Sequence, residues 1–414
     1  KLKAFLLEKG SILNGGSIKY SAHNWLDELY PVVRCELRLS DQLDVDRLKR
    51  AVVAVGKIIP EIFASYEVAD NQFVPLDRDA ATIVKVVTDY DEGAANRLDF
   101  MNQPQLKIIV TGEKLIIFVS HILSDGAGTK QLLYLLAECY NRQAVPKGIQ
   151  NHTDIDGIRQ LLATTKPTVN TTDHPSEKLL LPKLADSQSP TYEVIHTQLT
   201  EQQTQALHAA TRKLGVTLND MLMAAFGKTI QQYCGVEAIA LACPTDMRQY
   251  LPADQRQQLR VQNMTARYNF DVVSQPEEGL AVTAKKVHEQ MVDRKKAKQF
   301  LDSIRGLVAK VDAGQSIDEL QKVVEASYHV REIAYTNFGI VDQERLRFAD
   351  TDVQQLIMTG SFRRMPMYQV AISTFNGEMT LAVNMIGSRA ERQFGRAVLD
   401  HMRVRLLAIT DGLD

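Results

Sequence analysis

Apolar and polar positions along this chain follow patterns that predict both strands and helices. Residues 115–119 alternate as a strand does, and beyond a short polar turn the apolar positions at 132–136 recur with helical spacing. A second apolar run at 106–110 precedes the strand, with Gly112 and Glu113 between the two. The pattern therefore predicts a hairpin that ends in a turn and leads into a helix.

The same reasoning predicts further strands and helices along the chain, which indicates a mixed α/β fold. Thr200 and Thr217 stand where helix N-caps are expected, and Gly215 and Gly235 stand where helices end. Asn376 and Gly377 separate two alternating runs, which is typical of a type I′ hairpin. We expect other strands at 32–40, 82–87, 191–199, 238–243 and 334–341, and helices at 44–55, 155–164, 200–214, 217–234, 276–296, 300–311, 317–330 and 390–407.

The chain is long enough for two lobes. It has 414 residues, of which 45% are hydrophobic, so it can bury two ordinary cores. Between residues 145 and 190 the sequence is rich in Thr, Pro, Asp, Asn and Ser, which is typical of a linker. We predict an N-terminal lobe at 1–165, a linker at 166–190 and a C-terminal lobe at 191–414.

Charge and composition narrow the possible partners. The formal net charge is -2, so no strong field would concentrate nucleic acid or an anionic membrane. No apolar run is long enough to span a bilayer, and residues 1–11 lack the apolar core of a signal peptide. The four cysteines form no C-x-x-C pair and no metal-ligand spacing. We expect a cytoplasmic protein without a metal site or a membrane anchor.

The turn after the strand at 115–119 carries the pattern H-x-x-x-D-G, at His121, Asp125 and Gly126. Histidine can take or give a proton near neutral pH because its ordinary pKa is about 6.5. The carboxylate follows four residues later, and a glycine lets the backbone turn where a side chain would clash. The pattern indicates proton-transfer chemistry at a strand end, although a single histidine there is often only a hydrogen-bonded structural residue.

This stretch resembles the acyl-transfer motif of the chloramphenicol-acetyltransferase-like superfamily. That superfamily includes alcohol acetyltransferases, plant-type acyltransferases and the condensation domains of peptide synthetases. The motif often begins with two histidines, and the first falls on Ser120 in this chain. The resemblance implies two similar α/β lobes, each a mixed sheet with flanking helices, and a tunnel between them. Single-histidine forms are common among O-acyltransferases, so this departure favours ester formation.

Other segments extend the resemblance. Residues 244–248, PTDMR, are similar to the family's P-V-D-L-R, and residues 336–339, TNFG, are similar to its S-N-x-G. The D-F-G-W-G segment of plant-type members is absent. The resemblance implies that Asp125 holds the loop and pairs with an arginine, for which Arg248 is the candidate. It also implies that His121 is the general base on the acceptor.

Two further groups have candidate roles. Thr336 and Asn337 could donate hydrogen bonds to the oxyanion of the tetrahedral intermediate, or could simply cap the backbone of a strand end. A basic run at 294–298 could meet the phosphates of coenzyme A or of a carrier arm, or could be a solvated helix face. Ser120 is expected to face away from His121, because side chains alternate along a strand.

The resemblance implies an acyltransferase that moves an acyl group, for example an acetyl group, from acyl-CoA to a hydroxyl by direct transfer. No tightly bound cofactor is expected, and the partners would be a small-molecule donor and acceptor. One alternative is an amide-forming condensation domain that uses phosphopantetheinyl groups on a carrier protein. Another is a catalytically silent module that binds a hydrophobic ligand. Both lobes lie on one chain, so a monomer could form the site.

Overall fold

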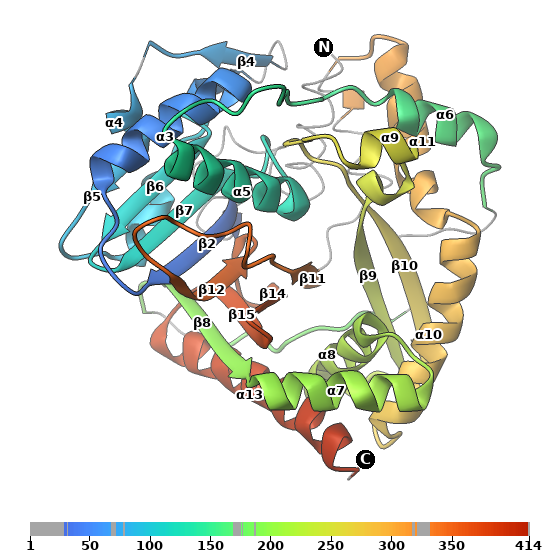
Figure 1. Cartoon of the computed structure of the whole chain (residues 1–414). Coiled ribbons are helices and arrows are strands. Elements are labelled where there is room, and N and C mark those ends of the chain that lie inside the picture. The colour runs from blue at the N-terminus through green and yellow to red at the C-terminus, as the bar shows by residue number, and fades with distance from the viewer. Residues whose placement is uncertain are drawn as a thin grey trace.

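The structure is a computed structural model, which describes residues 29–412 except 31, 68–71, 78, 169–174, 176, 186–187, 317–318 and 321–331. The two predicted lobes are present, and each is built on a mixed β-sheet with helices against it (Figure 1). The helix predicted at 317–330 and the N-terminal segment 1–11 lie outside the described residues.

The sheet of the N-terminal lobe has the strand order β12-β2-β7-β6-β5. The predicted hairpin at its centre is confirmed, because β6 and β7 pair antiparallel and Gly112 adopts a positive φ of 55° in their turn. The strand predicted at 82–87 is shorter than expected. Asp79 accepts a hydrogen bond from the Ala81 main chain and starts a helical turn, α4 (Ala80–Ile83). The strands are β2 (Val32–Leu39), β5 (Val84–Val86), β6 (Leu106–Thr111), β7 (Lys114–Ser120) and β12 (Val353–Thr359).

Two helices cover one face of this sheet, α3 (Val45–Ile58) and α5 (Gly126–Arg142) (Figure 1). Asp44 caps α3 by accepting a hydrogen bond from the Arg47 main chain, as its sequence position predicts. The apolar face of α3 is buried against α5 and the sheet. The helix that follows the H-x-x-x-D-G turn is thereby fixed to the lobe core.

The C-terminal lobe contains a second mixed sheet, with the order β1-β13-β15-β14-β11 and with β8 paired to the other edge of β15. The predicted type I′ hairpin between β14 and β15 is confirmed, since Asn376 and Gly377 both have positive φ, 50° and 77°. The strands are β1 (Leu29–Tyr30), β8 (Thr191–Leu199), β11 (Ile333–Ile340), β13 (Phe362–Arg364), β14 (Tyr368–Phe375) and β15 (Glu378–Gly387).

A two-stranded antiparallel ribbon, β9 (Ala238–Asp246) with β10 (Thr265–Val273), lies beside this sheet. Strand β9 runs next to β11 without pairing with it. The predicted caps of two helices are confirmed, because Thr200 and Thr217 both form capping boxes. The helices of this lobe are α7 (Glu201–Leu214), α8 (Leu218–Cys234), α10 (Leu280–Lys296), α11 (Asp302–Asp312) and α13 (Arg389–Asp411).

Short elements connect these parts. A small hairpin forms beside α3, and helical turns follow β9 and precede α11. The described residues of the segment 166–190 contain no helix or strand. The short elements are β3 (Ala64–Glu67), β4 (Gln72–Pro75), α6 (Asp156–Thr164), α9 (Ala253–Arg256), η2 (Pro60–Phe63), η3 (Glu92–Arg97), η4 (Met247–Tyr250) and η5 (Gln299–Leu301).

The two halves of the sequence are interleaved in space. Strand β12, from the C-terminal half, pairs with β2 at the edge of the N-terminal sheet. Helix α6, from the N-terminal half, packs its Ile158 and Leu162 into the core of the C-terminal lobe. The division of the sequence at residues 165 and 191 stays a prediction, and any boundary must allow for these two exchanged elements.

An apolar cluster joins the lobes. The face of the N-terminal sheet opposite α3 and α5 contributes Ile116 and Phe118, and the second sheet contributes Phe362 and Ile386. This contact fixes the two sheets relative to each other.

Among the described helices, none combines the length and the apolar character needed to cross a bilayer.

Candidate active site

His121 directly follows β7 and lies at the junction of the two lobes. Its ring is half-buried, and Asn263 from the loop before β10 donates from Nδ2 to the His121 main-chain oxygen (3.4 Å) and lies 3.2 Å from ring Nδ1. Because Nδ1 faces the side chain of Asn263, Nε2 is the ring nitrogen that is left for a ligand.

The surroundings of His121 favour the neutral imidazole. Burial lowers the pKa of His121 below its ordinary value of 6.5. The main-chain carbonyl of His121 and the carboxylate of Asp125 act in the opposite direction, and the guanidinium of Arg363 lowers the pKa further. A neutral imidazole at pH 7 can accept a proton, which is the property that a general base needs.

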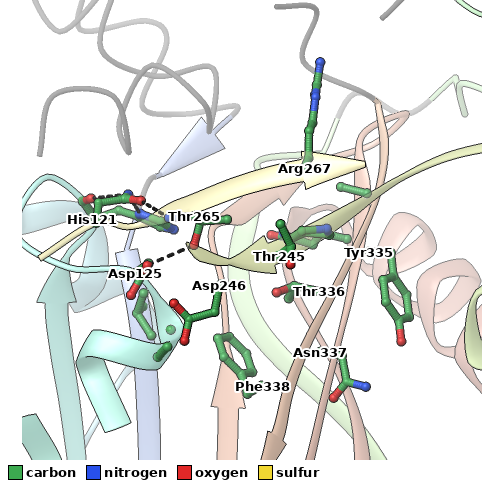
Figure 2. A pocket seen from close by; sticks show the side chains of 18 of the residues that line it. His121, Asp125, Thr245, Asp246, Thr265, Arg267, Tyr335, Thr336, Asn337 and Phe338 are labelled. Atoms are coloured by element: carbon green, nitrogen blue, oxygen red, sulfur yellow. Dashed lines mark hydrogen bonds between the residues drawn. The ribbon is translucent and has the colours of Figure 1, made fainter. Parts of the chain in front are cut away.

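Asp125 is the N-cap of α5, and both of its oxygens are fully occupied. Oδ1 accepts hydrogen bonds from the Gly128 main chain (2.7 Å) and from Arg248 (3.1 Å). Oδ2 accepts hydrogen bonds from Met264 N (2.7 Å), Thr265 Oγ1 (3.0 Å, Figure 2) and Arg248 (3.0 Å). A carboxylate with five donors has no lone pair free for a second proton-transfer role, so the geometry assigns it to holding the loop.

Arg248, in the helical turn η4 that follows β9, is the arginine opposite Asp125. Its Nη1 and Nη2 form a two-pronged ion pair with the carboxylate, and Nη1 also contacts Asp246 at 2.8 Å. The remaining donors reach the main-chain oxygens of Arg260 and Gln262. Burial alone would raise the pKa of Asp125, but Arg248 and the main-chain donors hold it below its ordinary value.

Gly126 serves packing rather than a sharp turn. It is the first residue of α5, and it is not among the glycines of positive φ. A Cβ atom at this position would lie 2.3 Å from two ring carbons of Phe338 on β11. The expectation that the glycine allows an unusual backbone turn is therefore wrong, and the physical reason for a glycine here is the ring that lies against it.

A cavity of about 220 Å³ opens at His121 between the lobes. The N-terminal lobe contributes His121 and Lys130, and strands β9, β10 and β11 contribute most of the opposite wall, including Thr245, Thr265 and Thr336 (Figure 2). The cavity lies where β9 and β11 run side by side without pairing. Hydroxyl, amide and charged groups are prominent in its wall, so polar groups of a ligand can be bound there.

The two candidate oxyanion donors differ in how they are held. Asn337 accepts a hydrogen bond from Gly339 N (2.8 Å) and donates to Asn219 of α8 (3.2 Å), an oxygen that Tyr335 also contacts. Thr336 lies on the cavity wall (Figure 2), and its hydroxyl makes no hydrogen bond within the described part of the chain. Thr336 is thus the better placed donor, while Asn337 fixes the bend of β11.

Two other groups lie away from the cavity. Ser120 is buried, and its Oγ accepts a hydrogen bond from Ile122 N within the turn, so the residue at 120 does not line the cavity. The basic run Arg294, Lys295, Lys296 and Lys298 lies at the end of α10 and after it, and none of the four lines the cavity.

Sequence patterns did not identify Asn263, Lys130 and Arg363 as cavity residues. Lys130 donates to the Phe338 main-chain oxygen (2.5 Å) and ties α5 to β11. Arg363 is buried on β13, on the wall of the cavity that also contains His121. Asn263 and Arg363 come from segments far from the turn in the sequence. Lys130 is on α5, at a position of the kind that is usually exposed on a helix. Lys130, four residues after Gly126 and thus one helical turn on, had the only local signal.

Comparison with known proteins agrees with this architecture. No protein-family model matches the chain, and no curated protein matches it in sequence. Among solved structures, polyketide synthase associated protein 5 from Mycobacterium tuberculosis is 16% identical, with a TM-score of 0.65 over 96% of this chain and 98% of that chain. The chain has the chloramphenicol-acetyltransferase-like fold.

Two further structures with this fold are similar over nearly their whole length. The first condensation domain of the CDA synthetase is 15% identical, with a TM-score of 0.62 over 97% of this chain and 95% of that domain. The epimerization domain from the third module of tyrocidine synthetase B is 14% identical, with a TM-score of 0.60 over 94% and 95%. The expected fold is thus confirmed.

Proposed function

We propose that this protein is an acyltransferase that moves an acyl group from a phosphopantetheinyl thioester to a hydroxyl or amine acceptor, with His121 as general base. The observation that supports it best is the position of His121. Its pKa is lowered, its Nδ1 is turned to the wall, and its ring lines a cavity between the lobes. The described side chains leave this cavity open, which favours an enzyme over a silent binding module.

The transfer needs no covalent intermediate on the protein. Nε2 of His121 takes the proton of the acceptor as its oxygen or nitrogen attacks the thioester carbonyl carbon. The tetrahedral intermediate then collapses, the carbon–sulfur bond breaks, and the thiolate receives the proton from the imidazolium. The hydroxyl of Thr336 is our candidate donor to the oxyanion.

The comparisons change our proposal for the acyl donor, which was first expected to be acyl-CoA. Two of the similar structures are a condensation and an epimerization domain of peptide synthetases, and a third is named as associated with a polyketide synthase. This likeness supports a carrier-bound donor over acyl-CoA. The basic run at 294–298, a candidate site for the phosphates of coenzyme A or of a carrier arm, lies outside the cavity wall and does not distinguish the two donors.

The acceptor is proposed as a hydroxyl or an amine. Ser120 had favoured ester formation, because it replaces the first histidine of the family motif. Since its side chain is buried in the turn and does not line the cavity, residue 120 cannot contact an acceptor. Either nucleophile can transfer its proton to a neutral imidazole, so both classes belong in the test.

The test is an acyl-transfer assay with donors and acceptors varied separately. Acyl groups are offered on a phosphopantetheinylated carrier protein and on coenzyme A, with hydroxyl and amine acceptors, and the products are identified by mass spectrometry. We expect transfer from the carrier and a loss of at least 100-fold in His121→Ala. His208→Ala, on α7 outside the cavity, is the matched control. No transfer with any donor, or equal rates for His121→Ala and wild type, contradicts the proposal.

A further inference from the structure

Gln369 lines the cavity from strand β14 of the C-terminal sheet. It is paired with Ala334 of the parallel neighbour β11, and Ala334 lines the same cavity. Paired residues of neighbouring strands project to the same face of a sheet, so the side chain of Gln369 lies on the cavity face. The methyl group of Ala334 is too short to cover it. Gln369 therefore presents a side-chain amide to the cavity.

This amide makes no hydrogen bond within the described part of the chain, and its Oε1 is buried. A Cβ atom on Gly360 would lie 2.7 Å from that oxygen, so the amide rests directly on the main chain of Gly360. Asn384 holds this main chain in place by donating from Nδ2 to Gly360 O (2.8 Å). Buried polar groups in proteins nearly always have a hydrogen-bond partner. For Gln369 the open side is the cavity, so a bound molecule is the candidate partner.

The amide is close to the proposed reaction centre. Thr336, the candidate oxyanion donor, is two residues beyond Ala334 on β11. It is thus one strand across and two residues along from Gln369, which amounts to about 8 Å between the Cα atoms. A group bound by Gln369 would then lie only a few bonds from the carbon atom that is attacked.

We infer that Gln369 is a specificity-determining residue that binds a hydroxyl group of the substrate, a few bonds from the reacting atom. A hydroxyl both donates and accepts hydrogen bonds, so it can pair with either atom of the amide. A methyl group of the same size would leave the amide without a partner. The hydroxyl belongs either to the acyl group or to the acceptor. Its place in acyl transfer rests on the proposed function, but its binding to Gln369 does not.

The test uses pairs of ligands that differ only in a hydroxyl or a methyl group. The acyl pair is β-hydroxybutyryl-pantetheine and isovaleryl-pantetheine, and the acceptor pair is isoamyl alcohol and its analogue with one methyl replaced by hydroxyl. In at least one pair, we expect wild type to bind the hydroxyl ligand roughly 2- to 12-fold more tightly, the value of one neutral hydrogen bond. That ligand should also shift the side-chain ¹H–¹⁵N signal of Gln369, which is assigned by its absence in Gln369→Leu.

Two variants probe the amide itself. Gln369→Leu keeps the approximate size of the side chain and removes the amide, so the preference for the hydroxyl ligand should vanish or reverse. Gly360→Ala keeps the glutamine but displaces its amide, so it should weaken the preference too. Gly360 has no positive φ, so its backbone accepts alanine. Gln202→Leu, on the exposed surface of α7 outside the cavity, is the matched control and should keep the wild-type preference.

The acyl-transfer assay gives the second readout, because the same preference should appear in kcat/KM. Equal binding within both pairs, no binding of any of the four ligands, or an unchanged preference in Gln369→Leu overturns the inference. If Gln369→Leu loses the binding preference but no donor supports transfer, the inference stands and the proposed function fails. If transfer occurs without any preference, the proposed function stands and the inference fails.

Discussion

Arg248 donates from both terminal nitrogens to both oxygens of Asp125, at 3.0 and 3.1 Å, and so fastens the turn after His121 to the helical turn η4. The two residues are 123 positions apart in the sequence and both are buried. The position of the imidazole therefore depends on the C-terminal half of the chain. Folding of the site and docking of the two lobes are coupled through this pair.

Loss of Arg248 should destabilise the fold as well as the site. Arg248→Ala leaves the buried carboxylate of Asp125 without its cation, and removal of one partner of a buried ion pair costs on the order of 3 to 5 kcal/mol. We expect a lower urea midpoint at neutral pH, together with loss of acyl transfer. Urea denaturation followed by circular dichroism measures the change.

Arg347→Ala is the control for the loss of an arginine. Arg347 pairs with Glu344 three residues away, and both side chains are well exposed. Exposed pairs of this kind contribute less than about 1 kcal/mol. If Arg248→Ala were no more destabilising than Arg347→Ala, the buried pair would not have the role described for it.

Gly126→Ala should disturb the interface between α5 and β11. The added Cβ would meet the Phe338 ring at 2.3 Å, and overpacking of a core typically costs about 1 to 3 kcal/mol. The displaced strand carries Thr336, so we also expect a lower kcat. Thermal unfolding and the acyl-transfer assay measure the two effects.

A second substitution tests the cause. Phe338→Leu removes the ring atoms that clash, so the double variant should recover most of the stability that Gly126→Ala loses. Gly306→Ala in α11 is the matched control, because nothing lies within 4 Å of its new Cβ. That change should be neutral or slightly stabilising, since alanine is the better helix former. No recovery in the double variant would show that the contact with Phe338 is not the reason for a glycine.

Local sequence signals predicted much of the secondary structure. The hairpin that presents His121 follows from two apolar runs and a glycine turn, and the caps at Asp44, Thr200 and Thr217 follow from side chains that accept main-chain hydrogen bonds. These features depend on residues a few positions apart. The H-x-x-x-D-G turn was visible for the same reason.

Contacts between distant segments could not be predicted in this way. Nothing in the sequence near β12 indicates that it joins the N-terminal sheet, and nothing near Asn263 indicates that it meets a histidine 142 positions earlier. The packing of Phe338 on Gly126 is equally remote, so the glycine was first explained by its backbone. Ser120 was correctly expected to face away from the site. The preference for a hydroxyl acceptor was drawn from the identity of residue 120 and did not depend on the direction of its side chain.

Thr336 and Asn337 should respond differently to substitution. Thr336→Val keeps the shape of the side chain and removes a hydroxyl from the cavity wall, and loss of an oxyanion donor typically costs about 100 to 1000-fold in kcat. Asn337→Ala removes hydrogen bonds to Gly339 and Asn219 instead. We expect it to lower the melting temperature, whereas Thr336→Val should not. Steady-state kinetics and thermal unfolding of both variants separate the roles, and an unchanged kcat in Thr336→Val would exclude the hydroxyl as the donor.

The pH dependence of acyl transfer should report the lowered pKa of His121. The neutral ring is the base and the imidazolium is inactive, so kcat/KM should fall as the pH drops through the pKa of the free enzyme. Because burial lowers this pKa, the midpoint of the acidic limb should lie below pH 6.5. The lowered pKa of His121 also affects stability. The unfolded chain binds a proton on this ring from about pH 6.5 downward, while the folded chain does not. The contribution of His121 to the free energy of unfolding therefore decreases as the pH falls through that range. Kinetics between pH 5 and 8 measure the limb, with urea midpoints of wild type and His121→Gln over the same range to isolate the contribution of the ring. An acidic limb above pH 6.5 would mean that the ring is stabilised as the cation, and the general-base role would then require another group.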